Sequence, residues 1–146
     1  MATEHNSLRE GARLGVIVAT AIWVWLALVD LIVGEPFRTF NLLGGIALFT
    51  LLHYLINIAY GVAVVSGIHG AAREPSLLIA VAFGFVIVQF ALAMVTVLLS
   101  RIGLGQLAWV RILGGNVIGA AIGFAILSRK HALREVMREA EEEEAE

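Results

Sequence analysis

Four long apolar stretches, separated by short polar segments, occupy most of the chain. They cover approximately residues 14–33, 41–68, 76–99 and 107–127, and Asp30 and Arg111 are the only Asp, Glu, Lys or Arg residues within them. A bilayer core about 30 Å thick needs roughly 20 consecutive apolar residues for one helical crossing. The pattern therefore predicts an all-α polytopic membrane protein, with an antiparallel four-transmembrane-helix bundle in residues 1–128.

The segments between the apolar stretches contain residues that end or begin helices. Pro36 disfavours a helical conformation at the residue before it, and Pro75 is suited to the first turn of the third helix. Gly103 and Gly105 lie in the last connection. Residues 129–146 hold no helix breaker and are rich in Glu, Arg and Ala, so they are predicted to form a charged cytoplasmic helical tail.

Composition supports a membrane protein and excludes several other classes. Hydrophobic residues make up 60% of the 146-residue chain, and mean hydropathy is +0.90. The absence of cysteine excludes disulfides and thiolate metal sites. No basic stripe with interleaved aromatic residues occurs, which argues against a nucleic-acid partner. The expected partners are the lipid bilayer and other membrane subunits or further copies of the chain.

The distribution of basic residues predicts the orientation, because cytoplasmic loops carry an excess of Lys and Arg. With a cytoplasmic N-terminus, the inner side would hold Arg9, Arg13, Arg73, Arg129, Lys130, Arg134 and Arg138. The outer side would hold Arg38, Arg101 and Arg111. We therefore expect a multi-pass protein of the cell inner (plasma) membrane with both termini in the cytoplasm.

Four polar residues fall close to the predicted bilayer midplane: His53, Asn57, Gln89 and Asn116. Polar side chains in hydrocarbon should face the bundle and form hydrogen bonds between helices. The favoured interpretation is a structural polar layer that sets helix register. A proton relay, a ligand site or a quinone contact is the alternative. Haem ligation at His53 would need a second imidazole from another subunit.

Asp30 and Arg111 form a second candidate pair. Each lies six residues from the centre of its predicted helix, on the same side of the membrane, or about 9 Å from the midplane at about 1.5 Å per residue. A lone charge at that depth is costly. We predict a buried ion pair that joins the first and fourth transmembrane helices.

Small residues recur every four positions in the fourth helix, at Gly115, Gly119 and Gly123. Such a glycine zipper makes a flat groove that allows another helix to approach closely. The groove is expected to pack either on the second or third helix of the same chain or on another copy. Ala80 and Gly84 form a shorter pattern of the same kind on the third helix.

One part of the chain, approximately residues 22–65, resembles a known group of proteins. The matching residues are Asp30, Leu31, Gly34, Pro36, Thr39, Leu43, Gly44, His53 and Gly61. In this pattern the chain resembles an uncharacterised group of small bacterial four-helix integral membrane proteins, in which proline commonly follows the threonine, whereas Phe40 stands here. The resemblance implies the four-helix fold and a bacterial inner-membrane setting, and it implies no activity.

No motif of known catalytic chemistry occurs, such as Gly-x-Ser-x-Gly, His-Glu-x-x-His or a Walker-type loop. We therefore expect no enzyme activity, no catalytic residues, no cofactor and no metal site. The favoured hypothesis is a non-catalytic structural or accessory subunit of a larger membrane complex. The alternatives are a small ion or solute channel or transporter that uses the midplane layer, and a cofactor- or lipid-binding protein centred on His53.

Overall fold

A computed structural model describes residues 2–71 and 73–130, and the described chain is almost wholly helical. The longer helices are α1 (Ala2–Ile32), α3 (Ile46–Ala71), α4 (Ser76–Leu99) and α5 (Gly114–Lys130). The shorter elements are the helix α2 (Arg38–Leu42) and the π-helical turns η1 (Ser100–Leu104) and η2 (Trp109–Leu113). The tail predicted to be helical lies, from residue 131 on, outside the described residues.

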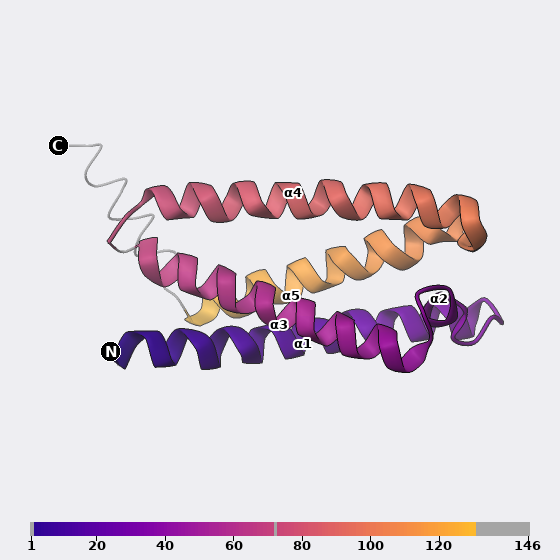
Figure 1. The fold of residues 1–146 in the computed structure, drawn as a ribbon, viewed down its shortest axis with the longest axis horizontal. Coiled ribbons are helices and arrows are strands. Elements are labelled where there is room, and N and C mark those ends of the chain that lie inside the picture. Colours follow the sequence, from indigo (N-terminus) through magenta and orange to yellow (C-terminus); the bar gives the residue numbers. More distant parts are fainter. Residues whose placement is uncertain (1, 72, 131–146) are drawn as a thin grey trace.

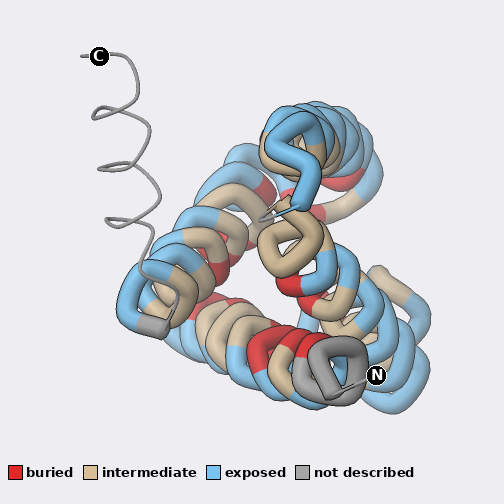
Figure 2. Tube along the Cα trace, turned by 90° about the vertical axis from the view of Figure 1, so that its left-hand side faces the viewer, coloured by how far each residue is buried: buried red, intermediate tan, exposed pale blue. Residues whose placement is uncertain are grey.

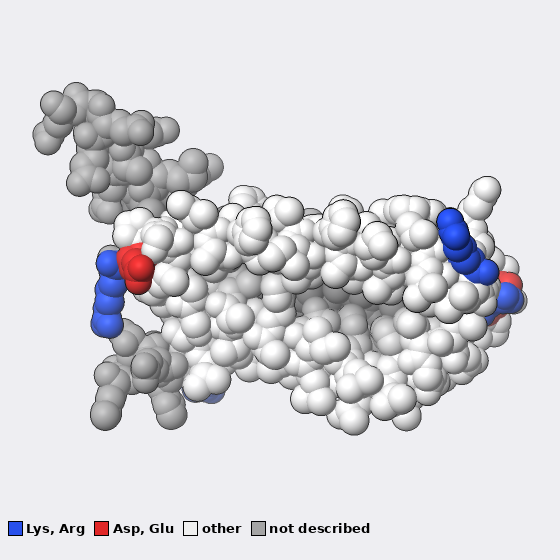
Figure 3. Space-filling view, turned by 45° about the horizontal axis from the view of Figure 1, so that its top comes forward, with Lys and Arg blue, Asp and Glu red and all other residues white. Residues whose placement is uncertain are grey.

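Within the described part of the chain, four helical segments are long and apolar enough to cross a membrane. They are Ser7–Ile32, Ile46–Ala71, Ser76–Leu104 and Trp109–Arg129. On the face drawn in Figure 3, charged side chains lie at the two ends of the molecule, and the long middle band is uncharged. Both features are those of a multi-pass membrane protein, because charges are costly in hydrocarbon and acceptable at its borders.

The four long helices lie along one axis, and each runs back relative to the one before it (Figure 1). Seen end on, they form a ring in which α1 and α4 are on opposite sides (Figure 2). Helix α1 contacts α3 along one face and α5 along another, whereas α4 contacts α3 and the π-helical turns. Helix α1 therefore packs on α3 and α5, and α4 lies across the ring from it (Figure 2).

Burial follows this arrangement. Helix α1 contributes Leu14, Ala19, Leu26 and Val29 to the set of buried apolar side chains. Helix α4 carries large exposed side chains along most of its length, and its buried residues are Thr96 and Leu99 near its end. The apolar surface of α4 therefore contributes little to packing within the described chain.

The first two predicted helices differ from those in the structure. Helix α1 begins at Ala2 rather than near residue 14, since no helix breaker interrupts the N-terminal residues. The second predicted helix, residues 41–68, is divided because Gly44 and Gly45 adopt positive φ angles of 99° and 93° between α2 and α3. Glycine reaches such angles without the steric cost that other residues meet.

The last two spans include π-helical turns that the hydropathy pattern does not reveal. Helix α4 covers Ser76–Leu99, as the prediction of residues 76–99 had it, and continues into η1. The fourth span begins with η2 and becomes α-helical at Gly114, whereas a single helix from residue 107 was expected. π-Helical turns are rare and often occur at functional sites.

Candidate functional site

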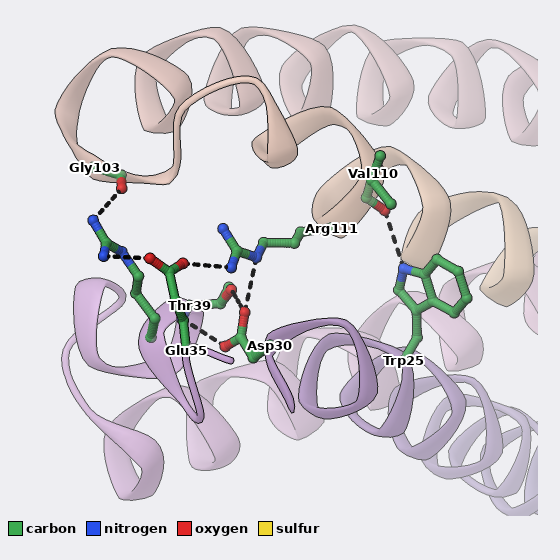
Figure 4. A network of polar contacts seen from close by, with 8 residues as sticks. Trp25, Asp30, Glu35, Thr39, Gly103, Val110 and Arg111 are labelled. Atoms are coloured by element: carbon green, nitrogen blue, oxygen red, sulfur yellow. Dashed lines mark hydrogen bonds and ion pairs between the residues drawn. The ribbon is translucent and has the colours of Figure 1, made fainter. Parts of the chain in front are cut away.

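The structure brings Asp30 and Arg111 together, as the sequence pattern predicted. Asp30 lies near the end of α1 and Arg111 lies in η2, and both side chains are 0% exposed. Arg111 Nε is 2.8 Å from Asp30 Oδ1 (Figure 4). The pair therefore ties the first span to the fourth, 81 positions apart in the sequence.

Asp30 has a second partner that the sequence did not indicate. The backbone N–H of Thr39 donates to Asp30 Oδ2 at 2.8 Å, and the Thr39 hydroxyl donates to Asp30 Oδ1 at 2.7 Å. Thr39 is in the first turn of α2, where Phe37 at the N-cap position makes no side-chain cap. A carboxylate is a strong acceptor for such unpaired N–H groups. Asp30 thus caps α2 and pairs with Arg111 at the same time.

Glu35 extends this cluster toward the surface. Its Oε2 accepts a hydrogen bond from Arg111 Nη2 at 3.0 Å, and its Oε1 accepts one from Arg38 Nη1 at 2.7 Å. Arg38 Nη2 donates in turn to the carbonyl oxygen of Gly103 at 2.8 Å (Figure 4). The link after α1, the start of α2 and the turn η1 are therefore joined by one charged network.

The network has balanced charge, with Asp30 and Glu35 opposite Arg38 and Arg111. The contact between Arg111 Nε and Asp30 is an ion pair without hydrogen-bond alignment, and Arg111 Nη1 has no hydrogen-bond partner among the described residues. Close opposite charges offset the cost of burying each one only when the geometry is good. This arrangement suits a structural tie between helices.

A further hydrogen bond joins α1 to the same π-helical turn. Trp25 Nε1 donates to the carbonyl oxygen of Val110 at 3.1 Å (Figure 4). The widened turn of a π-helix changes which carbonyls are used within the helix. The carbonyl next to Arg111 is therefore bound by the same helix that holds Asp30.

The four midplane residues form two separate pairs. On α3, Asn57 Nδ2 donates to the carbonyl oxygen of His53 at 2.8 Å. On α4 and α5, the Asn116 amide donates to the side-chain oxygen of Gln89. Both pairs are partly buried, and no hydrogen bond is found between the two pairs within the described residues. The expected single layer is therefore absent among these four residues. They form two separate hydrogen-bonded pairs instead, one beside α1 and one between α4 and α5.

His53 is used for packing between α1 and α3. Its Nε2 lies 3.0 Å from the carbonyl oxygen of Ala19, and because a carbonyl only accepts, Nε2 carries the proton. The imidazole also stacks on Phe49, with ring centroids 5.1 Å apart. Nδ1 faces the Asn57 amide at 3.4 Å. Both ring nitrogens therefore face protein atoms.

The glycine face of the fourth span packs on α1, so the expectation of the second or third helix was wrong. A Cβ on Gly115 would lie 3.3 Å from Ile22 Cγ2, and one on Gly119 would lie 2.7 Å from Ile22 Cδ1. A Cβ on Gly123 would lie 3.7 Å from Val18 Cγ2. The suggested partner Gly84 has no atom within 4 Å of a built Cβ in the described structure.

The closest helix contact in the described chain was missed. A Cβ on Gly11 would lie 2.4 Å from Val62 Cα, and one on Gly15 would lie 2.4 Å from the Asn57 carbonyl oxygen. A Cβ on Gly61 would lie 2.4 Å from the Gly11 carbonyl oxygen. The backbones of α1 and α3 therefore touch. The Gly-x3-Gly spacing of Gly11 and Gly15 is the signal for this contact in the sequence. Gly11 lies among the polar N-terminal residues, which the hydropathy pattern placed outside the first helix.

Among the described residues, no three His, Cys, Asp or Glu side chains converge in an arrangement that could hold a metal ion. His69 lies between Ser7 Oγ, 2.5 Å from its Nδ1, and Glu10 Oε2, 3.8 Å from its Nε2. This cluster joins α1 to α3 at the end of the molecule opposite Asp30.

Comparisons with family models, with curated proteins and with solved structures found no match.

Proposed function

We propose that the chain is a non-catalytic structural or accessory subunit of a larger membrane assembly, and that α4 is the helix that faces its partner. The observation that carries the proposal is the packing of α4. In the Ser76–Leu104 span, no residue of the most apolar 18-residue window is buried against the described part of the chain. Its exposed side chains include Ile79, Phe83 and Phe90, which are all more than 60% exposed.

The physics of helix association in lipid supports a partner for α4. Lipid tails are as apolar as leucine, so helices associate through close packing and hydrogen bonds rather than through the hydrophobic effect. Helices α1 and α3 are joined to each other by close packing and by hydrogen bonds. Helix α4 contacts α3 near its start, where Leu77 and Val81 pack on Gly70 and Gly67. It also has the Gln89–Asn116 hydrogen bond and the turns at its end, and its remaining surface is available to a neighbour. The glycine face of α5 is not available, because α1 covers it.

The partnering of polar groups favours this role over a channel or transporter. A conducting path needs polar side chains that face water along the bundle interior. Here Asp30, Arg111 and Thr39 are fully buried, Arg111 and Thr39 both contact Asp30, and His53 is bound to α1. These polar groups act between helices, as structural ties do.

Affinity purification from the native membrane in mild detergent, followed by native mass spectrometry, tests the proposal. We expect the chain to co-purify with other membrane subunits or with further copies of itself. Phe83→Ala and Phe90→Ala on α4 should reduce this association, whereas Phe124→Ala, at an equally exposed site on α5, should not. A monodisperse monomer, or equal loss with all three variants, would contradict the proposal.

The proposed setting is a bacterial inner membrane, where the chain forms an antiparallel bundle with both termini in the cytoplasm and a helical extension after the last span. The positions of the basic residues support this orientation. Arg9 and Arg13 on α1, Arg73 between α3 and α4, and Arg129 on α5 belong to one end, and Arg38 and Arg101 belong to the other. Basic residues favour the cytoplasmic side.

The absence of native cysteine allows a direct test of orientation. Arg73→Cys and Arg101→Cys place single thiols at opposite ends of α4 and η1. A membrane-impermeant maleimide added to intact cells should label the Arg101→Cys protein and leave the Arg73→Cys protein unlabelled. The reverse pattern would invert the proposed orientation.

A further inference from the structure

Two hollows meet on the surface at the link between α1 and α2. The larger, of about 500 Å³, is open and is lined by Glu35, Pro36, Arg38, Asn41 and Leu42. The smaller, of about 190 Å³, is lined by Trp23, Val24, Ala27, Leu28, Leu31, Pro36 and Phe37. Pro36 lines both. The first is called the charged hollow because Glu35 and Arg38 line it, although most of its lining surface is apolar. The second is called the apolar hollow, and almost all of its lining surface is apolar.

The charged hollow can bind a phosphate and an ammonium at the same time. The side chains of Arg38 and Glu35 are 46% and 35% exposed, although they contact each other. Arg38 uses one N–H on Glu35 and one on a carbonyl, so further donors remain for a phosphate. Each Glu35 oxygen accepts one hydrogen bond here and has capacity for another. Asn41 adds an amide that both donates and accepts.

The apolar hollow has fixed walls. The Trp23 indole donates to Thr50 Oγ1 at 2.9 Å and packs on the buried ring of Phe40, with centroids 5.0 Å apart. The ring of Phe37 also packs on Phe40, at 5.8 Å. Two aromatic walls of the hollow are therefore held by one buried side chain. Fixed walls lower the entropy cost of binding a flexible ligand.

Phe37 adds a second observation. Its φ angle of 60° is the only positive φ of a non-glycine residue in the described chain. Such a conformation is strained for a bulky residue, and it occurs often at ligand clamps. Phe37 lines the apolar hollow together with Pro36 and residues of α1. The strained residue is thus part of the hollow's wall.

The order of the two hollows matches the layers of a bilayer. Trp23 to Leu31 covers about 12 Å of α1 at about 1.5 Å per residue, within the membrane-spanning segment Ser7–Ile32. Glu35 and Arg38 lie just beyond the end of that segment. We propose that the two hollows form a binding site for one phospholipid with a primary ammonium headgroup, its phosphate on Arg38, its ammonium on Glu35 and an acyl chain against Trp23 and Leu28.

The chemistry of the headgroup makes the proposal specific. The primary ammonium of phosphatidylethanolamine donates hydrogen bonds to a carboxylate, whereas the quaternary ammonium of phosphatidylcholine has no N–H to donate. Phosphatidylglycerol carries the phosphate but no cation for Glu35. A site made by this pair of charges should therefore prefer the ethanolamine lipid, since hydrogen bonds between charged groups are the stronger ones.

The test uses the full-length protein purified in detergent and mixed with equal amounts of phosphatidylethanolamine, phosphatidylcholine and phosphatidylglycerol that have identical dioleoyl chains. Native mass spectrometry measures the occupancy of each lipid. We expect one ethanolamine lipid to be retained with about tenfold preference over the other two. Thermal unfolding in the presence of each lipid provides a second measurement, and the same lipid should raise Tm most.

Matched variants separate the site from the general lipid shell. Arg38→Gln removes the phosphate contact, and Arg101→Gln removes an exposed arginine at the same end. Leu28→Trp fills the apolar hollow, and Leu55→Trp places the same ring at a similarly exposed position on α3. Retention should fall about tenfold in the first variant of each pair and stay unchanged in the second.

Two outcomes would overturn the proposal. One is equal retention of the three lipids, which would identify ordinary shell lipid. The other is equal loss in a variant and its control. Because the Leu28→Trp variant leaves the Glu35–Arg38 contact in place, it tests the site even if Arg38→Gln disturbs the fold.

Discussion

Helix α1 has two packed faces, and they are made by different means. Toward α3, glycines bring the two backbones into contact, and a Cβ on Gly15 would lie 2.4 Å from a carbonyl oxygen. Toward α5, glycines receive side chains, and a Cβ on Gly119 would meet the end of Ile22 at 2.7 Å. Backbone atoms cannot move aside, whereas the end of a flexible side chain can.

The second face also includes charge. At its end, the buried Asp30–Arg111 pair fixes η2 against α1, and the face toward α3 has no ion pair at that depth among the described residues. The same Gly-x3-Gly spacing therefore makes a tight contact on the α3 face of α1 and a looser contact on its α5 face. The looser glycine contact is accompanied by a strong electrostatic tie.

The largest effect should come from breaking that tie. Arg111→Met leaves the Asp30 carboxylate buried without its cation, which should reduce the free energy of unfolding by about 3–5 kcal/mol. Titration with sodium dodecyl sulfate in mixed micelles measures this quantity. Adding Asp30→Asn should recover part of the loss, because the stranded charge is then removed.

Arg38→Met is the matched control, since Arg38 pairs with Glu35 at a more exposed position. Exposed pairs contribute about 0–1 kcal/mol, so its loss should be small. If Arg111→Met lowers the free energy of unfolding no more than Arg38→Met does, the Asp30–Arg111 pair does not stabilise the contact between α1 and the fourth span.

The next largest effect should come from the backbone contact on the other face. Gly15→Ala forces α1 away from α3, and overpacking of this kind costs about 1–3 kcal/mol. The gain in helix propensity from glycine to alanine works in the opposite direction, so a measured loss isolates the steric effect. The same micelle titration applies.

Gly123→Ala is the control for that variant, because its Cβ would meet Val18 at 3.7 Å, an ordinary contact distance. It should leave the free energy of unfolding unchanged or slightly raised. Equal losses at Gly15 and Gly123 would show that the two faces are packed alike.

These two faces also show what a sequence reveals in a membrane protein. Hydropathy indicated the spans, and the depth of two lone charges was enough to predict that Asp30 and Arg111 meet, because burial leaves each few other partners. The partner of the glycine face could not be predicted, since spacing describes one surface and says nothing of what lies against it. The part that Glu35 plays in the charged network could not be predicted, because a single charge beside a proline is ordinary in a loop.

The division of the midplane residues has a similar cause. The sequence predicted one layer because all four residues were placed at equal depth, but depth does not determine the angle at which a residue faces around the ring of helices. His53 and Asn57 face α1, and the amide pair lies between α4 and α5. Two adjacent glycines, Gly44 and Gly45, favour a break in the helix. The apolar residues on both sides of them favour one continuous helix, which is why a single helix was predicted.

A smaller effect should sharpen the comparison within the α5 face. Gly119→Ala should cost at most about 1 kcal/mol, because the clash is with the terminal methyl of Ile22, which can shift to another rotamer. Ile22→Val removes that methyl, so the double variant should be as stable as Ile22→Val alone. A double variant that stays less stable would mean that Ile22 Cγ1 or Val18 Cγ1, which lie 3.0 and 3.1 Å from the built Cβ, also opposes the added methyl.

The smallest effect should come from the His53 imidazole on the α3 face. His53→Phe keeps an aromatic ring against Phe49 and removes the N–H that binds the Ala19 carbonyl, which also belongs to helix α1's own hydrogen-bond ladder. Hydrogen bonds between helices in a membrane average about 0.6 kcal/mol, so the loss of unfolding free energy should be of that order. A much larger loss would mean that hydrogen bonding, rather than the glycine contact, dominates this face.

The His53→Phe measurement also tests the alternative of a cofactor site at His53. An imidazole reserved for a ligand would be dispensable for the fold without that ligand. A loss of about this size in the purified chain therefore favours the structural role.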